Sequence, residues 1–241
     1  MERFSRTRFL LGDDGMNKLK NAHVAVFGLG GVGGYVVEAL ARSGVGQLTL
    51  VDHDKISLSN INRQILATVE TVGMEKAQAA KARVKAINPG CEVTAICDFF
   101  GPSTRHLFDF TKYDYVVDAI DTVTGKLSLV EACKEAGTPI LCSMGAGNKL
   151  DPTAFRVADI YKTSVCPLAR IMRKECRKRG IEALKVVYSE EEPIECDLPA
   201  DDPAWAELPE GRNALPGSCA WVPSAVGLII AGEVIKDICS K

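Results

Sequence analysis

The sequence lacks the features of a secreted protein, of a protein with a structural zinc site and of a membrane-spanning protein. None of its nine cysteines falls in a CxxC pair, the motif that supplies thiolates to structural zinc sites. The opening segment MERFSRTRF has no apolar core after its basic residues, so we expect no secretory signal and a reducing, cytoplasmic compartment. The most apolar stretch, Val226–Ala231, is far shorter than the roughly 20 residues that a membrane-spanning helix needs. We therefore expect no membrane span.

Net charge and histidine are also scarce. The formal net charge is -2, which gives no overall attraction to polyanions, so any nucleic-acid contact must come from a local basic patch. The three histidines, His23, His53 and His106, flank predicted strands or lie in a predicted helix, and we expect structural roles for them. The hydrophobic share of 46% and charged share of 25% are typical of a globular protein. We predict one large domain over residues 1–241.

The first half of the chain alternates apolar strands with helices. His23–Phe27 is a continuous apolar run that ends on glycine, as a strand buried on both faces does. Gly33–Ser43 has apolar residues at helical spacing, and Gln47–Asp52 is a second apolar run. Further strands are predicted at 92–97, 115–119 and 139–143, and further helices at 75–87, 103–110 and 127–135. This alternation predicts an α/β fold with a doubly wound, mostly parallel, Rossmann-like sheet.

The C-terminal third departs from this rhythm, and we expect it to elaborate the sheet. It holds predicted strands at 155–159 and 184–188, a basic helix at 167–179 and a closing helix at 224–238. Residues 189–217 are rich in Glu, Asp and Pro, and proline interrupts any regular element there. We therefore predict a mobile, solvated loop over 189–217. Near the other end of the chain, only a short amphipathic piece is predicted, over 16–20.

A glycine motif follows the first strand. Gly28, Gly30 and Gly33 spell GxGxxG between a predicted strand and a predicted helix, where bare backbone lets phosphates approach the helix N-terminus. Asp52 ends the second strand, a position from which a carboxylate accepts hydrogen bonds from ribose hydroxyls. A tight turn needed only for packing would use the same glycines. If the motif binds a nucleotide, NAD and ATP both remain open at this point.

Polar segments farther along favour ATP. A hydride transfer has no use for the ordered set that they form, at 54, 59–64, 73–76 and 118–121. Acyl adenylation, by contrast, needs positive charge on the triphosphate and a carboxylate for magnesium. Arg63 and Lys76 supply the charge, and Asp121 supplies the carboxylate. A second interpretation of Asp121 stays open, as a cap for the helix after Thr122.

The strings GLGGVG, LVDHDKISLSNINRQ and AIDT, with the Gly73–Lys76 segment, resemble the adenylation core of ubiquitin-activating-like enzymes. The resemblance implies ATP and Mg²⁺ as cofactors, with Asp121 on the metal and Arg63 and Lys76 on the triphosphate. It also implies a homodimer in which Arg6, or as second choice Arg3, reaches the ATP of the partner subunit. The nucleotide ligands expected from motif and resemblance together are Gly28, Gly30, Gly31, Gly33, Asp52, Asp54, Asn60, Asn62, Arg63, Gln64, Lys76 and Thr122.

Outside that core, RFSRTRFLLG near the N-terminus, GAGNKLDPT at 145–153, DIYKT at 159–163 and CPLA at 166–169 resemble the tRNA threonylcarbamoyladenosine dehydratases. This resemblance runs across nearly the whole chain. It implies ATP-dependent cyclisation of threonylcarbamoyladenosine in tRNA through an acyl-adenylate of the threonyl carboxylate. The alternatives are adenylation of the C-terminal glycine of a ubiquitin-like sulfur carrier, and a catalytically silent binding protein. A sulfur-transfer partner stays open.

The cysteines argue against a thioester route, because no flanking constellation marks an activated thiol. Buried and inert side chains are expected for Cys91, Cys97, Cys133 and Cys142. Accessible loop positions, without a catalytic role, are expected for two others, Cys166 and Cys196.

Basic residues recur every three or four positions on the predicted helix at 167–179. They are Arg170, Arg173, Lys174, Arg177, Lys178 and Arg179. On an unplaced helix such a stripe is usually a solvated face. Beside a tRNA-modifying site it offers the local positive patch that an almost neutral protein needs to hold a polyanion, because neutralising phosphates releases counterions. We predict tRNA binding by the first five of these residues.

Overall fold

In the computed structural model, the described residues are 3–195, 199, 202, 205 and 216–240. Most of the predicted mobile loop lies outside this described part. Ser189, placed at its start, belongs to a strand instead. In the described part of the chain, no helix combines the length and apolarity needed to cross a bilayer.

Seven strands form one sheet in the order β3-β2-β1-β4-β5-β7-β6. All neighbouring pairs run parallel except β6 and β7, which run antiparallel. Because the chain starts in the middle and winds out in both directions, a topological switch point lies between β1 and β4, where such sheets bind ligands. The predicted doubly wound α/β fold is confirmed. The strands are β1 His23–Phe27, β2 Gln47–Val51, β3 Glu92–Ile96, β4 Tyr115–Asp118, β5 Ile140–Ser143, β6 Phe155–Asp159 and β7 Lys185–Ser189.

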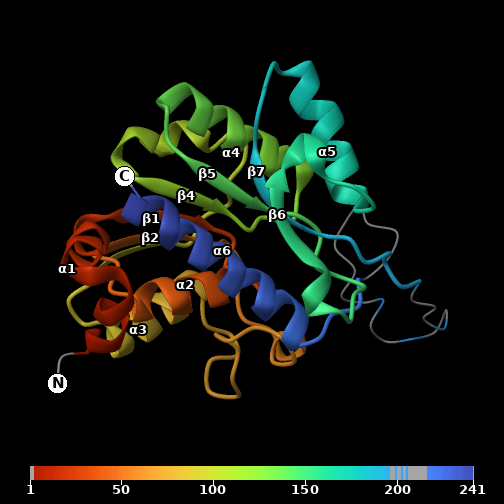
Figure 1. The fold of residues 1–241 in the computed structure, drawn as a ribbon. Coiled ribbons are helices and arrows are strands. Elements are labelled where there is room, and N and C mark those ends of the chain that lie inside the picture. The colour runs from red at the N-terminus through yellow and green to blue at the C-terminus, as the bar shows by residue number, and fades with distance from the viewer. Residues whose placement is uncertain (1–2, 196–198, 200–201, 203–204, 206–215, 241) are drawn as a thin grey trace.

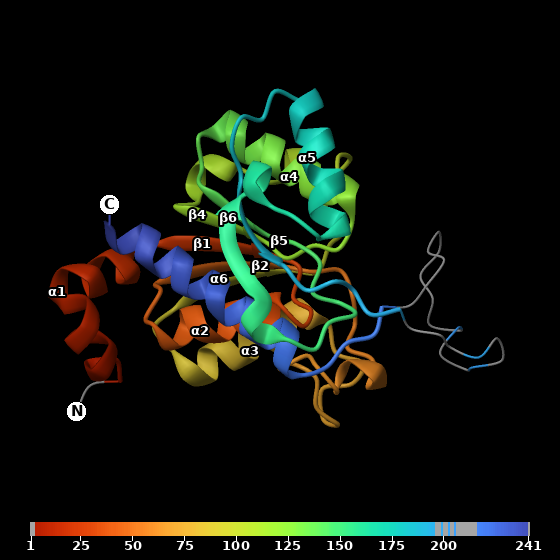
Figure 2. The ribbon, with the colours of Figure 1, turned by 45° about the vertical axis from the view of Figure 1, so that its right-hand side comes forward.

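Helices cover both faces of the sheet (Figures 1 and 2). On one face lie α1 Ser5–Asn21, α2 Gly33–Arg42, α3 Lys76–Ile87 and α6 Trp221–Ser240; on the other lie α4 Val123–Ala136 and α5 Pro167–Lys178. Side chains of β1 alternate between the two cores, since Val26 packs with α2 and α6 whereas Phe27 packs with α4. Burial on both faces explains why this strand is apolar throughout.

The helix predicted at 103–110 is wrong. Two short 3₁₀ turns, Arg105–Leu107 and Phe110–Lys112, stand there. The Asp109 side chain accepts a hydrogen bond from the Thr111 N–H and starts the second turn. The rings of Phe108 and Phe110, and of Phe100 just before the segment, pack around Phe27 of β1, and that cluster holds the segment against the sheet. Tertiary packing therefore overrides the apparent helical spacing.

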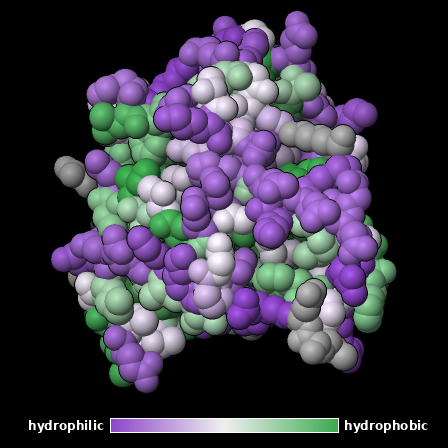
Figure 3. Space-filling view, turned by 90° about the vertical axis from the view of Figure 1, so that its left-hand side faces the viewer, coloured by the Kyte–Doolittle hydropathy of each residue, from purple (hydrophilic) through white to green (hydrophobic). Residues whose placement is uncertain are grey.

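The N-terminal helix α1 is longer than the predicted piece at 16–20. It begins at Ser5 and bends at Gly12, whose φ is 70°. The second half docks on α6, where the Lys18 ammonium donates to the Cys239 carbonyl at 3.1 Å. In the first half, Phe9 and Leu10 are 74% and 87% exposed. The side of the molecule on which α1 lies shows apolar groups interspersed among hydrophilic residues (Figure 3).

Candidate adenylation site

The glycine loop packs tightly against the chain that follows β4. Gly28 has a φ of 87°, and a Cβ there would lie 2.5 Å from the Ala119 carbonyl oxygen. A Cβ on Gly33 would lie 1.8 Å from the Gly28 carbonyl oxygen. Both positions therefore require glycine for packing alone. Gly30 differs, because only the Gln64 amide nitrogen, at 3.8 Å, comes near its Cβ position, which leaves room for a phosphate.

Asp52 anchors the glycine loop. Its Oδ2 accepts the Leu29 N–H at 2.6 Å and its Oδ1 accepts the Asp54 N–H at 2.9 Å, while the residue is only 8% exposed. The carboxylate thus fixes the loop after β1 to the loop after β2. Its expected contact with ribose stays a prediction.

Lys76 and Asp54 form an ion pair beside this anchor. The Lys76 ammonium lies 2.7 Å from Asp54 Oδ2, and the Lys76 N–H donates to the Asp54 carbonyl at 3.0 Å. Lys76 is 6% exposed, whereas the Asp54 carboxylate is half exposed. Lys76 begins α3, so the pair aims a cation from the start of a helix toward the carboxyl edge of the sheet. We infer that Asp54 positions Lys76.

The segment between β2 and α3 orders a second cation. Arg63 Nη1 donates to the Ser59 carbonyl at 2.9 Å and to Asn62 Oδ1 at 2.8 Å. The Asn62 amide in turn donates to the Ser218 carbonyl at 3.0 Å, which ties this segment to residues just before α6. Asn60 is 9% exposed, and its side chain closes a capping box with Ser57. The guanidinium is therefore held by its own segment at the edge of the site.

Two buried oxygen atoms at the site have no hydrogen-bond partner among the described residues. They are Gln64 Oε1 and Thr122 Oγ1. Buried polar oxygens are nearly always bonded in folded proteins, so each exception calls for an explanation. Both residues were predicted to contact the nucleotide, and a bound ligand that supplies donors or a cation would complete their bonding.

The loop after β4 carries Asp121. The residue is exposed, and the N-cap of α4 is Thr122, with the first helical residue at Val123. The interpretation of Asp121 as the helix cap is therefore wrong. Its carboxylate stands at the carboxyl end of β4, at the switch point of the sheet.

A buried ion pair beneath this loop was missed from the sequence. Lys126 of α4 and Asp118, the last residue of β4, are 1% and 0% exposed, with Nζ and Oδ2 3.1 Å apart. In the sequence, Lys126 precedes an apolar helix and gives no sign of being buried. Only the fold brings it under the sheet edge.

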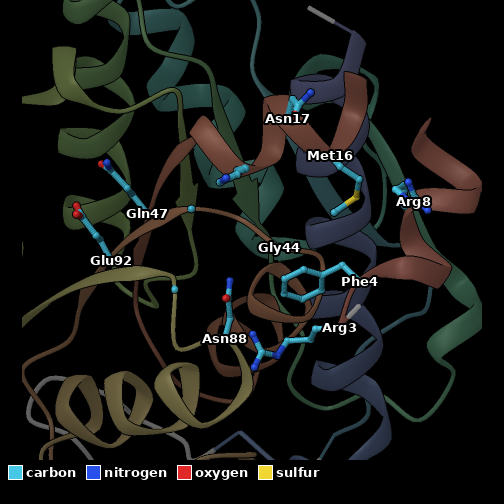
Figure 4. Close-up of a pocket in the computed structure, with 12 residues that line it drawn as sticks. Arg3, Phe4, Arg8, Met16, Asn17, Gly44, Gln47, Asn88 and Glu92 are labelled. Carbon is cyan, nitrogen blue, oxygen red and sulfur yellow. The ribbon is translucent and has the colours of Figure 1, made fainter. Parts of the chain in front are cut away.

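Arg6 lies far from the glycine loop of its own chain. The neighbouring Arg3, Phe4 and Arg8 line a cavity of about 510 Å³ together with Gln47 and Glu92, among others (Figure 4). Gln47 and Glu92 are the first residues of β2 and β3, so this cavity is at the amino edge of the sheet. The glycine loop follows the carboxyl end of β1, at the opposite edge. The N-terminal arginines therefore cannot complete the site of their own chain.

Comparison with known proteins agrees with this geometry. The sequence profile of the ThiF family matches residues 4–241. The chain belongs to the ThiF family. It is 43% identical over 241 residues to the tRNA threonylcarbamoyladenosine dehydratase of Bacillus subtilis, covering 99% of this chain and 95% of that protein. The Escherichia coli enzyme of the same name is 33% identical over 257 residues, covering 100% of this chain and 94% of that protein.

A solved structure gives the same result. The Escherichia coli tRNA N6-threonylcarbamoyladenosine dehydratase TcdA in complex with ATP superposes on this ThiF-family chain with a TM-score of 0.87. The match has 32% identity and covers 99% of this chain and 94% of that one. The expected membership of the adenylating superfamily, and the likeness to its tRNA-modifying branch, are confirmed.

The cations of the basic helix α5 in this ThiF-family chain fall into three groups. Arg173 donates to the Thr163 carbonyl at 2.7 Å, and the Arg177 guanidinium lies 5.2 Å from the centre of the Tyr161 ring. These two hold the loop that precedes the helix, while Lys178 and Arg179 both pair with Glu175 of α5 itself. The third group, Arg170 and Lys174, is exposed and forms no ion pair with any described residue.

Most described cysteines are unsuited to thioester chemistry. Burial raises the pKa of the Cys133 thiol to about 12 and that of Cys91 to about 11. Two expectations are wrong: Cys97 is exposed because it follows the edge strand β3, and Cys166 is 1% exposed because it packs beneath α5. Cys196 lies outside the described residues.

Proposed function

We propose that this chain is an ATP-dependent tRNA threonylcarbamoyladenosine dehydratase, built as a single adenylation domain over residues 1–241. The observation that carries the proposal is the 43% identity to a dehydratase of that name across 99% of this chain. Because the likeness extends beyond the nucleotide-binding half, it includes the segments that would hold the acyl substrate. Cations and carboxylates stand at the carboxyl edge, where adenylation requires them.

ATP would lie across the glycine loop. Gly30 and Gly31 would face the phosphates, Asp52 the ribose, and Arg63 and Lys76 the triphosphate. The orphaned oxygen atoms of Gln64 and Thr122 support a ligand at this place. The remaining expected ligands, Gly28, Gly33, Asp54, Asn60 and Asn62, would act mainly by shaping and orienting the site.

Asp121 would hold Mg²⁺, with the Thr122 hydroxyl beside it. An exposed carboxylate followed by a buried hydroxyl without a partner suits a hard cation that prefers oxygen ligands. Bound there, the ion would neutralise charge on the phosphates. Asp52, His53 and Asp54 also cluster, but both oxygens of Asp52 accept backbone hydrogens and Asp54 pairs with Lys76. These existing bonds favour Asp121 as the ligand.

The reaction would take two steps. A threonyl carboxylate oxygen attacks the α-phosphorus of ATP and pyrophosphate leaves, which forms an acyl-adenylate. A nitrogen of the same modified base then attacks the acyl carbon, AMP leaves with the carboxylate oxygen, and the nitrogen loses its proton as the ring closes. Holding both groups in one substrate can lower the barrier by roughly 7–11 kcal/mol, so orientation replaces a strong catalyst.

The tRNA would lie against α5, where Arg170 and Lys174 are available to phosphates and Arg173, Arg177 and Lys178 shape the surface. The enzyme would act as a cytoplasmic homodimer, with Arg6 of one subunit reaching the ATP of the other. The position of Arg6 at the amino edge supports a role in trans. We propose no sulfur-transfer partner.

Pyrophosphate exchange tests this function. Exchange of labelled pyrophosphate into ATP should depend on tRNA that carries threonylcarbamoyladenosine and should be absent with unmodified tRNA. Exchange driven instead by a ubiquitin-like carrier ending in glycine would establish the sulfur-carrier alternative. Absence of exchange with either substrate, together with ATP binding, would favour a silent binding protein.

A further inference from the structure

The buried pair Lys126–Asp118 has a position that stability alone does not explain. Its two charged groups are almost completely removed from water, with side chains 1% and 0% exposed. Removing charges from water costs so much that apolar residues of similar volume are often as stable as a buried ion pair, or more stable. The buried charges therefore call for a role in holding neighbouring segments in place.

The pair joins two loops at the carboxyl edge of the sheet. Lys126 Nζ donates to the Ser143 carbonyl at 2.7 Å as well as to Asp118, and Asp118 Oδ1 accepts the Ile120 N–H at 3.0 Å. Ser143 ends β5 and leads into the loop at 144–151, which contains GAGNKLD. Ile120 directly precedes Asp121. One ammonium group thus connects the nucleotide side of the site to the loop whose GAGNKLD sequence resembles the tRNA-modifying enzymes.

The same loop also contacts the glycine motif. The Ala119 N–H donates to the Phe27 carbonyl at 2.8 Å, and the Ala119 carbonyl lies against Gly28 at a distance that no Cβ would tolerate. A shift of the segment at 119–122 would therefore move the phosphate-binding backbone too. The glycine loop, the segment at 119–122 and the loop at 144–151 are thus all connected to the buried Lys126–Asp118 pair.

We propose that Lys126 and Asp118 are a positioning pair that fixes loop 119–122 relative to loop 144–151, so that the carboxylate of the acyl substrate meets the α-phosphate. The inference rests on the proposed function, because it assigns the loop at 144–151 to the acyl substrate. Neither residue touches a reacting atom. Their effect is on orientation, for which a displacement of about 1 Å can cost roughly 100-fold in rate.

The test replaces the whole pair rather than one charge. Lys126→Met alone would leave the Asp118 carboxylate buried and unpaired, which destabilises any fold. The double variant K126M/D118L removes both charges; Met matches Lys in length, and Leu matches the branching of Asp but is larger. We expect a melting temperature close to that of the parent, an ATP dissociation constant within about threefold, and ring closure slower by at least ~10-fold at saturating ATP and tRNA. D118N/K126M, which retains the shape of Asp118, serves if the first double variant fails to fold.

A second Lys–Asp ion pair, at the amino edge of the sheet, serves as a comparison. Lys185, the first residue of β7, pairs with Asp237 of α6 at 2.8 Å. K185M/D237L removes the same chemistry from a strand–helix contact away from the site, so it should keep the parent rate. Because the Lys185 and Asp237 side chains are 31% and 34% exposed, this variant controls for the loss of a Lys–Asp ion pair, not for the burial of its charges.

Two results would overturn the inference. One is a folded K126M/D118L variant that closes the ring within about threefold of the parent rate. The other is a loss of ATP affinity equal to the loss of rate, since that would indicate a disrupted nucleotide site. A parent protein that does not act on modified tRNA would instead contradict the proposed function, and the variants would then be compared by pyrophosphate exchange.

Discussion

Two cations of the site differ in how they are held. Lys76 is buried and paired with Asp54, whereas the Arg63 guanidinium bonds to oxygens of its own segment. Each would stabilise charge that develops on the triphosphate, a role typically worth about 100-fold or more in rate. We expect Arg63→Ala and Lys76→Met to fold normally and to lose at least ~100-fold in ATP-dependent ring closure.

The control for this experiment is Lys81→Met, which removes a cation from α3 one turn and more beyond Lys76. It should retain the parent activity. Near-normal turnover in both Arg63→Ala and Lys76→Met would remove the adenylation interpretation.

The thiols give a prediction that depends on pH. Burial raises the pKa of Cys133 from 9.0 to about 12, so this thiol stays protonated at about pH 8 while an exposed thiol is partly ionised. Alkylation under those conditions, followed by peptide mass analysis, should modify Cys97 and leave Cys91 and Cys133 unmodified. Cys97→Ser should keep full activity. Loss of activity on that substitution would reopen a thioester route.

The raised pKa of Cys133 also makes the free energy of unfolding depend on pH. The folded state binds the Cys133 proton more tightly than the unfolded chain does, so this group stabilises the fold below about pH 9. The contribution declines as pH rises from about 9 toward 12. Urea unfolding of the parent and Cys133→Ala should therefore show the parent losing more of its stability over that interval.

At the scale of helices, α5 separates cations that serve the fold from cations that face solvent. We expect R170A/K174A to weaken binding of every tRNA about equally and to flatten the slope of log K against log salt by roughly 1.5 to 2 units, because two phosphate contacts are lost. The melting temperature should not change. Binding measured at several salt concentrations checks this, with K81A/K112A as the charge-matched control. An unchanged slope would mean that α5 presents only a solvated face.

Elements with local signals could be predicted, and elements fixed by distant contacts could not. The apolar run at 23–27 and the glycines after it predicted β1 and the start of α2 correctly. A strand buried on both faces of the sheet needs apolar side chains along its length, and that pattern is visible in the sequence. The helix predicted at 103–110 was wrong because Phe108 and Phe110 pack against Phe27 of β1, a contact that local spacing does not encode.

The candidate site shows the same division. Asp52, Lys76 and Asp121, which the motif spacing assigned to one nucleotide site, lie at the same edge of the sheet, and their contacts with ATP stay a prediction. The Asp54–Lys76 pair and the Lys126–Asp118 pair could not be predicted, because each joins residues whose proximity depends on how strands and helices pack. In the sequence Lys126 stands just before the helix predicted at 127–135, and a lysine at such a position predicts a solvent-facing side chain.

At the scale of the molecule, the location of Arg6 predicts a shared site. If Arg6 completes the partner's site, a homodimer has two equivalent sites, each built from both chains. Arg6→Ala and Asp121→Ala should each be inactive, and subunit exchange between them should restore one intact site in each heterodimer. Each heterodimer formed should have about half the activity of a parent dimer. No recovery despite demonstrated exchange would contradict a role in trans.

Transfer of a heavy oxygen isotope tests whether the ring closes through an acyl-adenylate. Threonylcarbamoyladenosine labelled in both carboxylate oxygens, within tRNA, would be turned over with ATP, and the phosphate-containing products would be analysed by mass spectrometry. Because the carboxylate oxygen attacks the α-phosphorus and leaves with it, we expect one heavy oxygen in each AMP, one AMP for each ring closed, and unlabelled pyrophosphate. Label in inorganic phosphate with release of ADP, or ring closure without labelled AMP, would contradict the acyl-adenylate.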